Sequence, residues 1–301
     1  MSKIRVFSAP MAGVSDYPFR QILRQFGNQT LFSEMIGVET LVHAHPKTLK
    51  MLTFKNEKNI VVQLVGANPE SMGRAAEIIS DLGVSGIDIN MGCPVKKLIQ
   101  NHSGAMLMKD QDLACRLVEA VKGHTSLPVS VKTRLGWQDS KEILTFAPRL
   151  VAAGADRIEI HARTKEAGYS GNPDWAILKS LKVHVPLVVN GNIIDQKTAI
   201  ESMKKSGAEA VMIGRALLGH PWRLSETETG VCPQFKMPDL VLKHLDLLLS
   251  YYGRAGLYVA RKHLSWYASR KKGVAKWREK MYLEENESRL KKLIKDFWEG
   301  E

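Results

Sequence analysis

Cysteine is scarce in this chain, which has three thiols in 301 residues, at positions 93, 115 and 232. Three cysteines cannot all pair, and no Cys-x-x-Cys motif occurs. This usage argues against a structural zinc site and an all-cysteine iron–sulfur cluster, so we expect no metal centre. It also favours a reducing, cytoplasmic compartment. Cys115 and Cys232 are most simply structural, since free cysteine is often buried as a small apolar residue.

Long apolar segments and nucleotide fingerprints are missing as well. No run approaches the roughly 20 apolar residues of a membrane span, and the first residues lack the apolar stretch of a secretory signal. No Gly-x-Gly and no Gly-Lys-Ser/Thr sequence occurs, so neither a dinucleotide fingerprint nor a P-loop is predicted. We therefore expect a cytoplasmic monomer with no membrane partner and no obligate protein partner.

What the chain does contain is a regular alternation of strand-like and helix-like segments. Short runs rich in Val, Ile and Leu, bounded by Gly or Pro, are typical of strands buried on both faces. Eight such runs occur, at 4–11, 30–35, 60–66, 87–90, 128–134, 156–163, 186–192 and 210–215. Segments with helical periodicity lie between them, including 70–82, 111–122, 140–153 and 196–205. Eight βα units in a little over 200 residues predict a (β/α)8 TIM barrel.

The strand–helix pattern stops near Trp222. Residues 224–237 are polar and contain Gly230 and Pro233, which is typical of a linker. From Asp239 onward the apolar residues recur at helical spacing, in four short segments that end near Trp298. The sequence therefore predicts two domains, a barrel over residues 1–230 and a small helical bundle over residues 231–301.

Positive charge is concentrated in the second domain. Residues 254–280 hold nine Lys and Arg against one acid, which accounts for +8 of the net charge of +12. Four aromatic residues, Tyr258, Trp266, Tyr267 and Trp277, are interleaved with them. A basic face that carries aromatics suits a phosphate backbone with bases available for stacking. The alternative is a solvated helical surface whose aromatic side chains, Trp266 and Trp277 above all, point into the bundle core.

Polar residues follow the predicted strands at their carboxyl ends, where barrel enzymes carry their chemistry. Turns begin at strand ends, so any one polar residue there can be structural. The amino-terminal ends of the same strands, however, show no matching residue types. The residues in question are Gln63, Asn90, Lys132, Arg134, His161, Arg163, Asn190 and Arg215.

The last two strands are followed by glycine-containing turns, Asn190-Gly191-Asn192 and Gly214-Arg215. In (β/α)8 barrels these two loops commonly bind phosphate through backbone N–H groups and a short helix N-terminus. With no dinucleotide fingerprint, a mononucleotide or sugar phosphate fits best. The first strand ends in Ala9-Pro10-Met11, a small turn against which a flat ring could lie. A tight turn without a ligand is an equally open interpretation of that segment.

Seven motifs recur in order along residues 9–222 and resemble the tRNA-dihydrouridine synthases. INMGCP together with the His-x-Arg and Gly-Arg-Ala elements is a specific combination, and CPVKK and GHPW are most similar to the bacterial B-type subgroup. The basic helical tail is similar to the RNA-binding domain of that family. The motifs are APMAGVSD at 9–16, QLVG at 63–66, INMGCPVKK at 89–97, VKTRLGW at 131–137, IHARTKEAGYSGNPDW at 160–175, NGNI at 190–193 and IGRALLGHPW at 213–222.

This resemblance implies a flavoenzyme that reduces the C5–C6 bond of a uridine in tRNA. NADPH (or NADH) would reduce FMN and leave, after which tRNA would present its uridine to the same face. Adding hydride to C6 leaves an enolate-like anion, so a positioned acid must protonate C5. Cys93 is the candidate, because a thiol with a pKa of about 8.5 is mostly protonated near neutrality. The neighbouring Lys96 and Lys97 could make it a nucleophile instead, and residue chemistry alone also allows a packed structural thiol.

The resemblance also implies roles for the residues at the strand ends. Lys132 and His161 would contact the flavin ring, Lys132 stabilising negative charge near N1, and Gln63 would bond its pyrimidine edge. From the residues alone, Lys132 could be a Schiff-base lysine and His161 a core histidine. Arg134 or Arg163 could equally belong to a structural ion pair. The expected FMN site comprises Ala9, Pro10, Met11, Gln63, Lys132, His161, Asn190, Gly191, Asn192, Gly214 and Arg215. The expected substrate contacts are Asn90, Lys96, Arg134, Arg163, Arg270, Lys271 and Lys272.

Transfer RNA is the partner that the resemblance implies, with the bundle gripping its phosphates while the barrel holds the extruded base. Two other interpretations are open. A flavin barrel could act on a free pyrimidine or dihydroorotate, although a small metabolite needs no basic tail. The chain could also be an inactive RNA-binding scaffold, against which the presence of Cys93, Lys132 and His161 argues.

Overall fold

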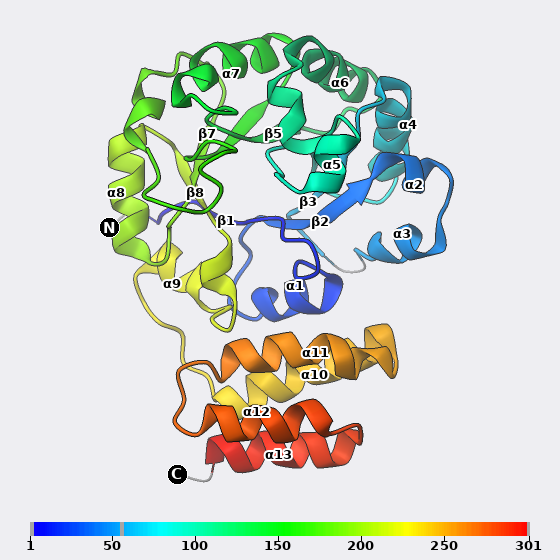
Figure 1. Ribbon diagram of the computed structural model, residues 1–301, viewed down its shortest axis with the longest axis vertical. Coiled ribbons are helices and arrows are strands. Elements are labelled where there is room, and N and C mark those ends of the chain that lie inside the picture. The colour runs from blue at the N-terminus through cyan, green and yellow to red at the C-terminus, as the bar shows by residue number, and fades with distance from the viewer. Residues whose placement is uncertain (1–2, 55–56, 300–301) are drawn as a thin grey trace.

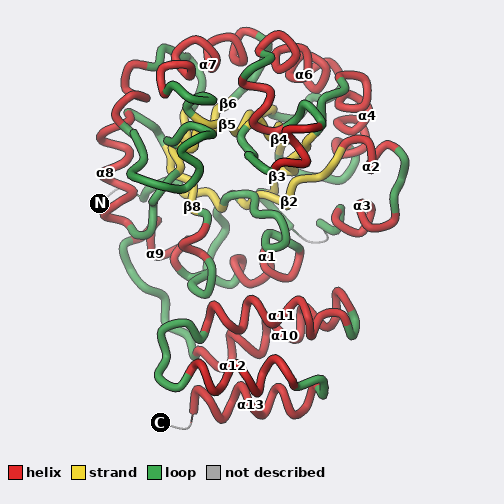
Figure 2. The backbone as a smooth tube through the Cα atoms, in the orientation of Figure 1, coloured by secondary structure: helices red, strands yellow, loops and turns green. Residues whose placement is uncertain are grey.

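Eight parallel strands form a barrel in the computed structural model, which describes residues 3–54 and 57–299. Each strand pairs with its neighbour in sequence from β2 to β8, and β8 pairs with β1. This confirms the predicted (β/α)8 barrel with C-terminal helices (Figures 1 and 2). The strands are β1 Val6–Ser8, β2 Leu31–Gly37, β3 Ile60–Val65, β4 Gly86–Met91, β5 Val129–Arg134, β6 Arg157–His161, β7 Leu187–Asn190 and β8 Ala210–Ile213.

The ring closes between β1 and β2 through a parallel bridge from Phe7 to Thr30. The N–H of Ser8 donates to the Thr30 carbonyl at 3.1 Å, and the N–H of Phe32 donates to the Ser8 hydroxyl at 3.1 Å. Buried apolar side chains pack on both sides of this ring, which is why the strands are rich in apolar residues. Closure brings all eight carboxyl ends to one rim.

Helices surround the strands as the periodicity predicts, with small shifts at their ends. The four predicted segments correspond to α4, α6, α7 and α8; the first three residues of the third form a 3-10 turn ahead of α7. Between β6 and β7 lies a short 3-10 helix, Ala176–Ser180. The helices up to the barrel's end are α1 Tyr17–Arg24, α2 Val38–Val42, α3 Pro46–Met51, α4 Pro69–Ser80, α5 Lys96–Gln100, α6 Gln111–Gly123, α7 Ile143–Ala152, α8 Gln196–Ser206 and α9 Arg223–Thr229.

The linker predicted for residues 224–237 is wrong in its first half, where α9 lies. Gly230 ends this helix in the left-handed region at φ 77°, rather than marking a loop. Leu224 and Thr227 are fully buried, and the Ile4 N–H donates to the Glu228 carbonyl at 3.3 Å. Contacts with β1 therefore hold a polar segment in helical form, which local composition did not reveal.

Four further helices form the bundle: α10 Met237–Tyr252, α11 Ala255–Tyr267, α12 Val274–Leu283 and α13 Glu287–Glu299. Their apolar faces make a second core that is separate from the core around the strands. Trp277 lies in it, 4% exposed, with its indole N–H donating to the Leu293 carbonyl at 3.1 Å. Among the described residues, none of the helices combines the length and apolar character needed to cross a lipid bilayer.

Helix α1 lies between barrel and bundle (Figure 1) and belongs to both cores. Asp16 caps it by accepting the Phe19 N–H at 2.9 Å, and Pro18 occupies its first turn. Phe19 and Leu23 face the barrel core, whereas Ile22 is fully buried in the bundle core. This short helix therefore connects the bundle to the barrel through both cores.

Aromatic and polar side chains line this junction. The Phe19 ring stacks on His263 at 5.7 Å between centroids, and His244 lies 4.4 Å from His263. The His244 Nδ1 atom is 3.0 Å from the Tyr267 hydroxyl. Tyr252 donates its hydroxyl to Asp16 at 3.0 Å. Both histidines are almost fully buried, so the junction favours their neutral forms.

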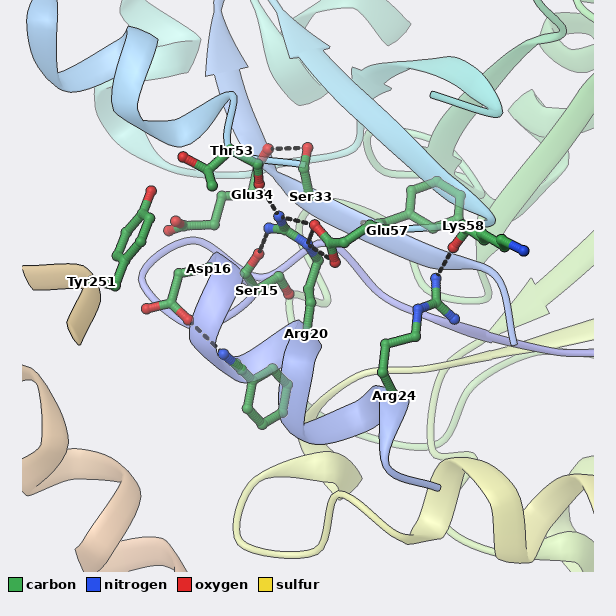
Figure 3. A network of polar contacts seen from close by, with 12 residues as sticks. Ser15, Asp16, Arg20, Arg24, Ser33, Glu34, Thr53, Glu57, Lys58 and Tyr251 are labelled. Atoms are coloured by element: carbon green, nitrogen blue, oxygen red, sulfur yellow. Dashed lines mark hydrogen bonds and ion pairs between the residues drawn. The ribbon is translucent and has the colours of Figure 1, made fainter. Parts of the chain in front are cut away.

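Arg20 anchors the barrel side of α1 in a network of polar contacts (Figure 3). Its guanidinium group is 2.6 Å from the Glu57 carboxylate, and both side chains are almost fully buried. It also donates to the carbonyl oxygens of Ser15 and Thr53, at 2.8 and 2.9 Å. Every oxygen and nitrogen in such a pair needs a partner, and these contacts lock α1 to the loop after α3.

We expect the close approach of α11 to the loop after β8 to make Gly219→Ala destabilising. A Cβ atom built at Gly219 would lie 2.4 Å from the Trp266 carbonyl oxygen. Gly207 has the same φ of +74°, but its Cβ would meet no described atom within 4 Å. Both substitutions carry the backbone strain, and overpacking should cost Gly219→Ala about 1–3 kcal/mol more. Urea unfolding of the two variants measures this difference in stability. Equal losses of unfolding free energy would refute a tight contact between α11 and the loop after β8.

The buried histidines at the junction should make the protein less stable in mild acid. Burial lowers the pKa of His244 to about 3 and that of His263 well below its usual range. Unfolding exposes them with a pKa of about 6.5. As pH falls below about 6.5, the unfolded chain therefore binds protons that the folded chain does not, and stability is lost. Asp16 acts in the opposite sense, since burial raises the pKa of its carboxyl to about 6.

Comparing variants separates these opposing effects. His263→Phe keeps the ring against Phe19 and should reduce the slope of unfolding free energy against pH by up to about 1.4 kcal/mol per pH unit between pH 6 and 5. The exposed His184 provides the control as His184→Phe. Urea unfolding at several pH values gives the slopes. If His263→Phe has the same slope of unfolding free energy against pH as the wild type, the His263 ring does not resist protonation in the folded protein.

Candidate active site at the barrel mouth

A cavity of about 720 Å³ opens at the carboxyl ends of the strands. This volume lies within the range of small-ligand sites. Residues at or near the ends of all eight strands line it, together with Trp266 of α11 in the bundle. Its lining includes every residue that the sequence predicted for the cofactor and three predicted for chemistry or substrate: Ala9, Pro10, Met11, Gln63, Asn90, Cys93, Lys132, Arg134, His161, Asn190, Gly191, Asn192, Gly214 and Arg215.

Strand register brings these side chains into adjacent positions. Asn90 of β4 pairs with Lys132 of β5, two residues before Arg134. Arg134 pairs with His161 of β6, which pairs in turn with Asn190 of β7. Residues separated by up to 100 positions thus meet on one side of the ring.

The turn after β1 forms a small, rigid wall. Ser15 holds it, accepting the Met11 N–H and donating to the Ala9 carbonyl, both at 3.1 Å. A Cβ atom at Gly214 would lie 3.4 Å from the Ala9 Cβ and 3.9 Å from the Met11 sulfur. The ends of β1 and β8 therefore lie side by side at this wall.

Cys93 stands on the loop after β4, half-buried and facing the cavity lining. The Asn90 side-chain oxygen accepts the N–H groups of Gly92 and Cys93, at 3.2 and 3.0 Å. The Asn90 amide donates to the Gln63 oxygen at 2.8 Å. Gln63 is 1% exposed, so its amide is bound within the barrel as well as lining the cavity.

Lys132 and His161 share the centre of the cavity. The Lys132 amine donates to the Asn190 oxygen at 3.5 Å, and the Asn190 amide donates to the Met212 carbonyl at 2.7 Å. Burial lowers the Lys132 pKa to about 8, against the opposing effect of Asp88. Burial, with Lys132 and three arginines nearby, lowers the His161 pKa to about 2, so this imidazole is neutral near pH 7. Its Nδ1 has no hydrogen-bond partner among the residues described.

Arg134 lines the cavity, and its guanidinium group donates hydrogen bonds to three backbone carbonyl oxygens. It donates to the Gly92 carbonyl at 2.8 Å, behind Cys93. Two more bonds reach the carbonyl oxygens of Thr164 and Gly168, at 3.1 and 2.8 Å. Its guanidinium group therefore ties the Cys93 loop to the loop after β6, instead of forming the ion pair that the sequence left open.

Arg163 lies outside the cavity lining and braces the same loop. Its guanidinium group donates to the carbonyl oxygens of Ser170 and Gly171, at 3.0 and 2.6 Å. Lys96 is exposed on α5 and is also outside the lining. Arg270 and Lys272 are exposed between α11 and α12, whereas Lys271 is half-buried with its amine 5.4 Å from the Phe297 ring centre. The structure thus does not gather these residues into the cavity.

The two final loops carry the residues that the sequence predicted for a phosphate. Gly191 and Asn192 have φ values of 121° and 53°, and the Trp175 indole holds the Gly191 carbonyl at 3.1 Å. Gly214 leads directly into a 3-10 turn, Arg215–Leu217, whose first side chain lines the cavity.

Sequence reasoning missed two aromatic residues of the lining, Tyr169 and Trp266. Tyr169 is 55% exposed, and its ring lies near His161, Arg134 and Arg215, at 5.9, 5.3 and 4.4 Å. An aromatic residue between Gly168 and Gly171 in a polar loop was a usable signal for it. Trp266 was expected to point into the bundle core; no local pattern indicates that its ring faces the barrel.

In the part of the chain that the structure describes, no group of three or more His, Cys, Asp or Glu side chains is arranged to hold a metal ion.

Comparison with known proteins agrees with this geometry. The family model described as Dihydrouridine synthase (Dus) matches residues 7–298. A protein named "Probable tRNA-dihydrouridine synthase" in Rhodobacter capsulatus is 41% identical over 87% of this chain and 86% of its own. A protein of the same name in Rickettsia conorii is 35% identical over 97% and 93%. "tRNA-dihydrouridine synthase B" of Xanthomonas axonopodis pv. citri is 35% identical over 88% and 83%.

Among solved structures, histamine dehydrogenase from Rhizobium sp. 4-9 superposes with a TM-score of 0.58 at 13% identity. The match covers 81% of this chain and 49% of that one, and it supports the fold. The family match spans nearly all of the barrel and the bundle together. The chain therefore belongs to the dihydrouridine synthase family of flavin-dependent oxidoreductases.

Proposed function

We propose that this protein reduces the C5–C6 bond of a specific uridine in tRNA, using FMN and electrons from NADPH or NADH. The barrel, residues 1–230, would be the catalytic domain and residues 231–301 the tRNA-binding domain. One observation carries the proposal: Cys93, Lys132 and His161 line a single cavity that Trp266 of the basic bundle completes. We also expect the enzyme to be cytoplasmic and monomeric, without an obligate protein partner.

The cavity residues fit a flavin mononucleotide. The buried His161 Nδ1 lacks a partner among the described residues, and the Lys132 amine has a long 3.5 Å contact, so both have capacity for a ligand. The wall of Ala9, Pro10 and Met11 would lie against the ring. Gly191, Asn192, Gly214 and Arg215 would hold the phosphate, and Gln63 would bond the pyrimidine edge.

When bound, the flavin supplies the hydride that adds to C6 of the uracil ring. Cys93 would then donate a proton to C5, since hydride addition alone leaves an anion. The loop contacts support this role, because Asn90 and Arg134 fix the backbone that carries the thiol. Asn90 and Arg134 would also border the uridine, whereas Arg163 would act as a brace.

The charges around the ring suit an electron-rich cofactor. With a pKa of about 8, Lys132 is mainly cationic near neutrality and would stabilise negative charge near N1. His161 is neutral and would contact the ring as a hydrogen-bonding imidazole.

The bundle would hold the body of the tRNA while the base is extruded into the barrel. Exposed cations Arg270, Lys272, Lys276 and Lys280 are available for phosphates. Lys271 of the bundle and Lys96 on α5 of the barrel are further proposed contacts. Tyr258 is 48% exposed on α11, beside Arg261, and could stack on a base. A free pyrimidine or dihydroorotate would need none of this surface, which favours tRNA as substrate.

We expect Cys93→Ala to retain the flavin and its reduction by NADPH but to lose about 10²–10⁴-fold in turnover on tRNA, the usual contribution of a general acid. Cys115→Ala provides the control, because Cys115 is a half-buried free thiol on α6 outside the cavity lining. Stopped-flow absorbance separates reduction of the flavin from its reoxidation by tRNA. Normal reoxidation in Cys93→Ala would assign the proton to another group.

Neutralising the exposed cations of the tail should weaken tRNA binding. The double variant Arg270→Gln, Lys272→Gln should also lower the slope of log affinity against log salt by about 2, at about 0.9 per lost phosphate contact. Its charge-matched control is Arg74→Gln, Arg116→Gln, on the exposed sides of α4 and α6 away from the bundle (Figure 1). Filter binding at several salt concentrations measures the affinity and its salt dependence for both double variants. If the two variants have the same slope, this surface is not part of the tRNA interface.

A further inference from the structure

Beneath the cavity, the barrel interior holds a polar layer that runs across four neighbouring strands. Register pairs Gln63 of β3 with Asp88 of β4, Asp88 with Ser130 of β5, and Ser130 with Arg157 of β6. Asp88 is completely buried, and Gln63 and Ser130 are nearly so. Polar side chains at this depth are kept only when they satisfy one another.

Hydrogen bonds join this layer to the loop that carries the thiol. Arg157 donates to the Ser130 hydroxyl at 3.2 Å, and Ser130 donates to one Asp88 oxygen at 2.8 Å. Gln63 donates to the other Asp88 oxygen at 2.6 Å. The Gln63 oxygen accepts from Asn90, whose own oxygen accepts the Cys93 N–H. The chain of contacts therefore extends from the barrel interior to Cys93.

The direction of each bond in this chain is fixed from both ends. Backbone N–H groups can only donate, so Asn90 must turn its oxygen toward Gly92 and Cys93 and its amide toward Gln63. Gln63 must then present its oxygen to Asn90 and its amide to Asp88. At the far end a guanidinium group can only donate, so Ser130 passes its proton toward Asp88. Asp88 is thus the one acceptor on which both directions converge.

We propose that Asp88 is a positioning residue for the proton donor, acting through Gln63 and Asn90 on the backbone of Cys93. The inference rests on the function proposed above. Without an acceptor beneath it, the Gln63 amide is free to turn over and present its N–H2 group to Asn90. Asn90 would then face the N–H groups of Gly92 and Cys93 with its own donor, and the loop would lose its anchor.

The relay depends on an oxygen at Asp88, not on a charge. Burial and the Glu159 carboxylate raise the pKa of Asp88, against the bonds from Gln63 and Ser130. If protonated, Asp88 would carry its proton on the oxygen facing Ser130; the Ser130 hydroxyl would then accept from both Arg157 and Asp88 and turn its own hydrogen away from Asp88. The oxygen facing Gln63 would still accept in either state. Asp88→Asn, which also presents an oxygen to Gln63, should therefore keep the relay, and Asp88→Ala should break it.

The first test measures the Cys93 loop directly and needs no turnover. The proteins are treated with iodoacetamide, and alkylation of each cysteine is followed by peptide mass spectrometry. Asp88→Ala should increase the alkylation rate of Cys93 at least threefold, whereas Asp88→Asn should stay within about twofold of wild type. Cys115 in the same sample is the internal control and should not change.

The second test is kinetic. A displaced donor should lower the rate of tRNA-dependent flavin reoxidation in Asp88→Ala by about 10–100-fold, with an unchanged KM for tRNA and restoration in Asp88→Asn. If Asp88→Ala does not fold, Gln63→Leu cuts the same relay one link further on and should expose Cys93 in the same way.

Wild-type alkylation in both Asp88→Ala and Gln63→Leu would overturn the inference, as would equal effects of Asp88→Ala and Asp88→Asn. A wild-type enzyme that forms no dihydrouridine in tRNA would refute the proposed function instead. The alkylation comparison would still decide whether Asp88 holds the loop, so the two failures are distinguishable.

Discussion

Closure of the parallel sheet is the constraint on which the rest of this structure depends. Parallel strands must return through crossovers on the outside, so their carboxyl ends all face one way. The bridge between Phe7 and Thr30 turns that common direction into a rim with no open side. Residues at or near the ends of all eight strands then surround one cavity, and register decides which of them are neighbours.

The second organising feature is α1, which belongs to two cores at once. Phe19 and Leu23 pack toward the strands and Ile22 toward the bundle. The buried Arg20–Glu57 pair prevents this helix from turning, because either group alone would be a buried unpaired charge. Through this contact the bundle is held where Trp266 reaches the cavity and where α11 meets Gly219. The barrel and the bundle thus both contribute residues to one site.

Charge is arranged in layers along the barrel axis. Lys132, Arg134 and Arg215 line the cavity, and the carboxylates of Asp88 and Glu159 are buried below them. Arg157 lies 2.5 Å from Glu159 and bonds Ser130, so the lower layer has its own cation. The upper layer therefore keeps positive charge that the protein does not neutralise, which suits an anionic ligand.

The sequence by itself determined the eight strands, the helical tail and the set of strand-end residues that line the cavity. Apolar runs and periodicity act over a few residues, and Lys132, His161 and Asn190 each end a run, so local pattern was sufficient. Family motifs added the resemblance that the comparisons then supported.

The tertiary structure alone decided how those residues are used. A segment with the composition of a loop forms α9, and the Trp266 ring lines the cavity although we expected it in the bundle core. Arg163 bonds the backbone of a loop and does not line the cavity. The tertiary structure also joined Asp88, Gln63 and Asn90, which lie on two strands. These outcomes depend on contacts between distant segments, and burial and hydrogen-bond pairing across such contacts leave no trace in local sequence.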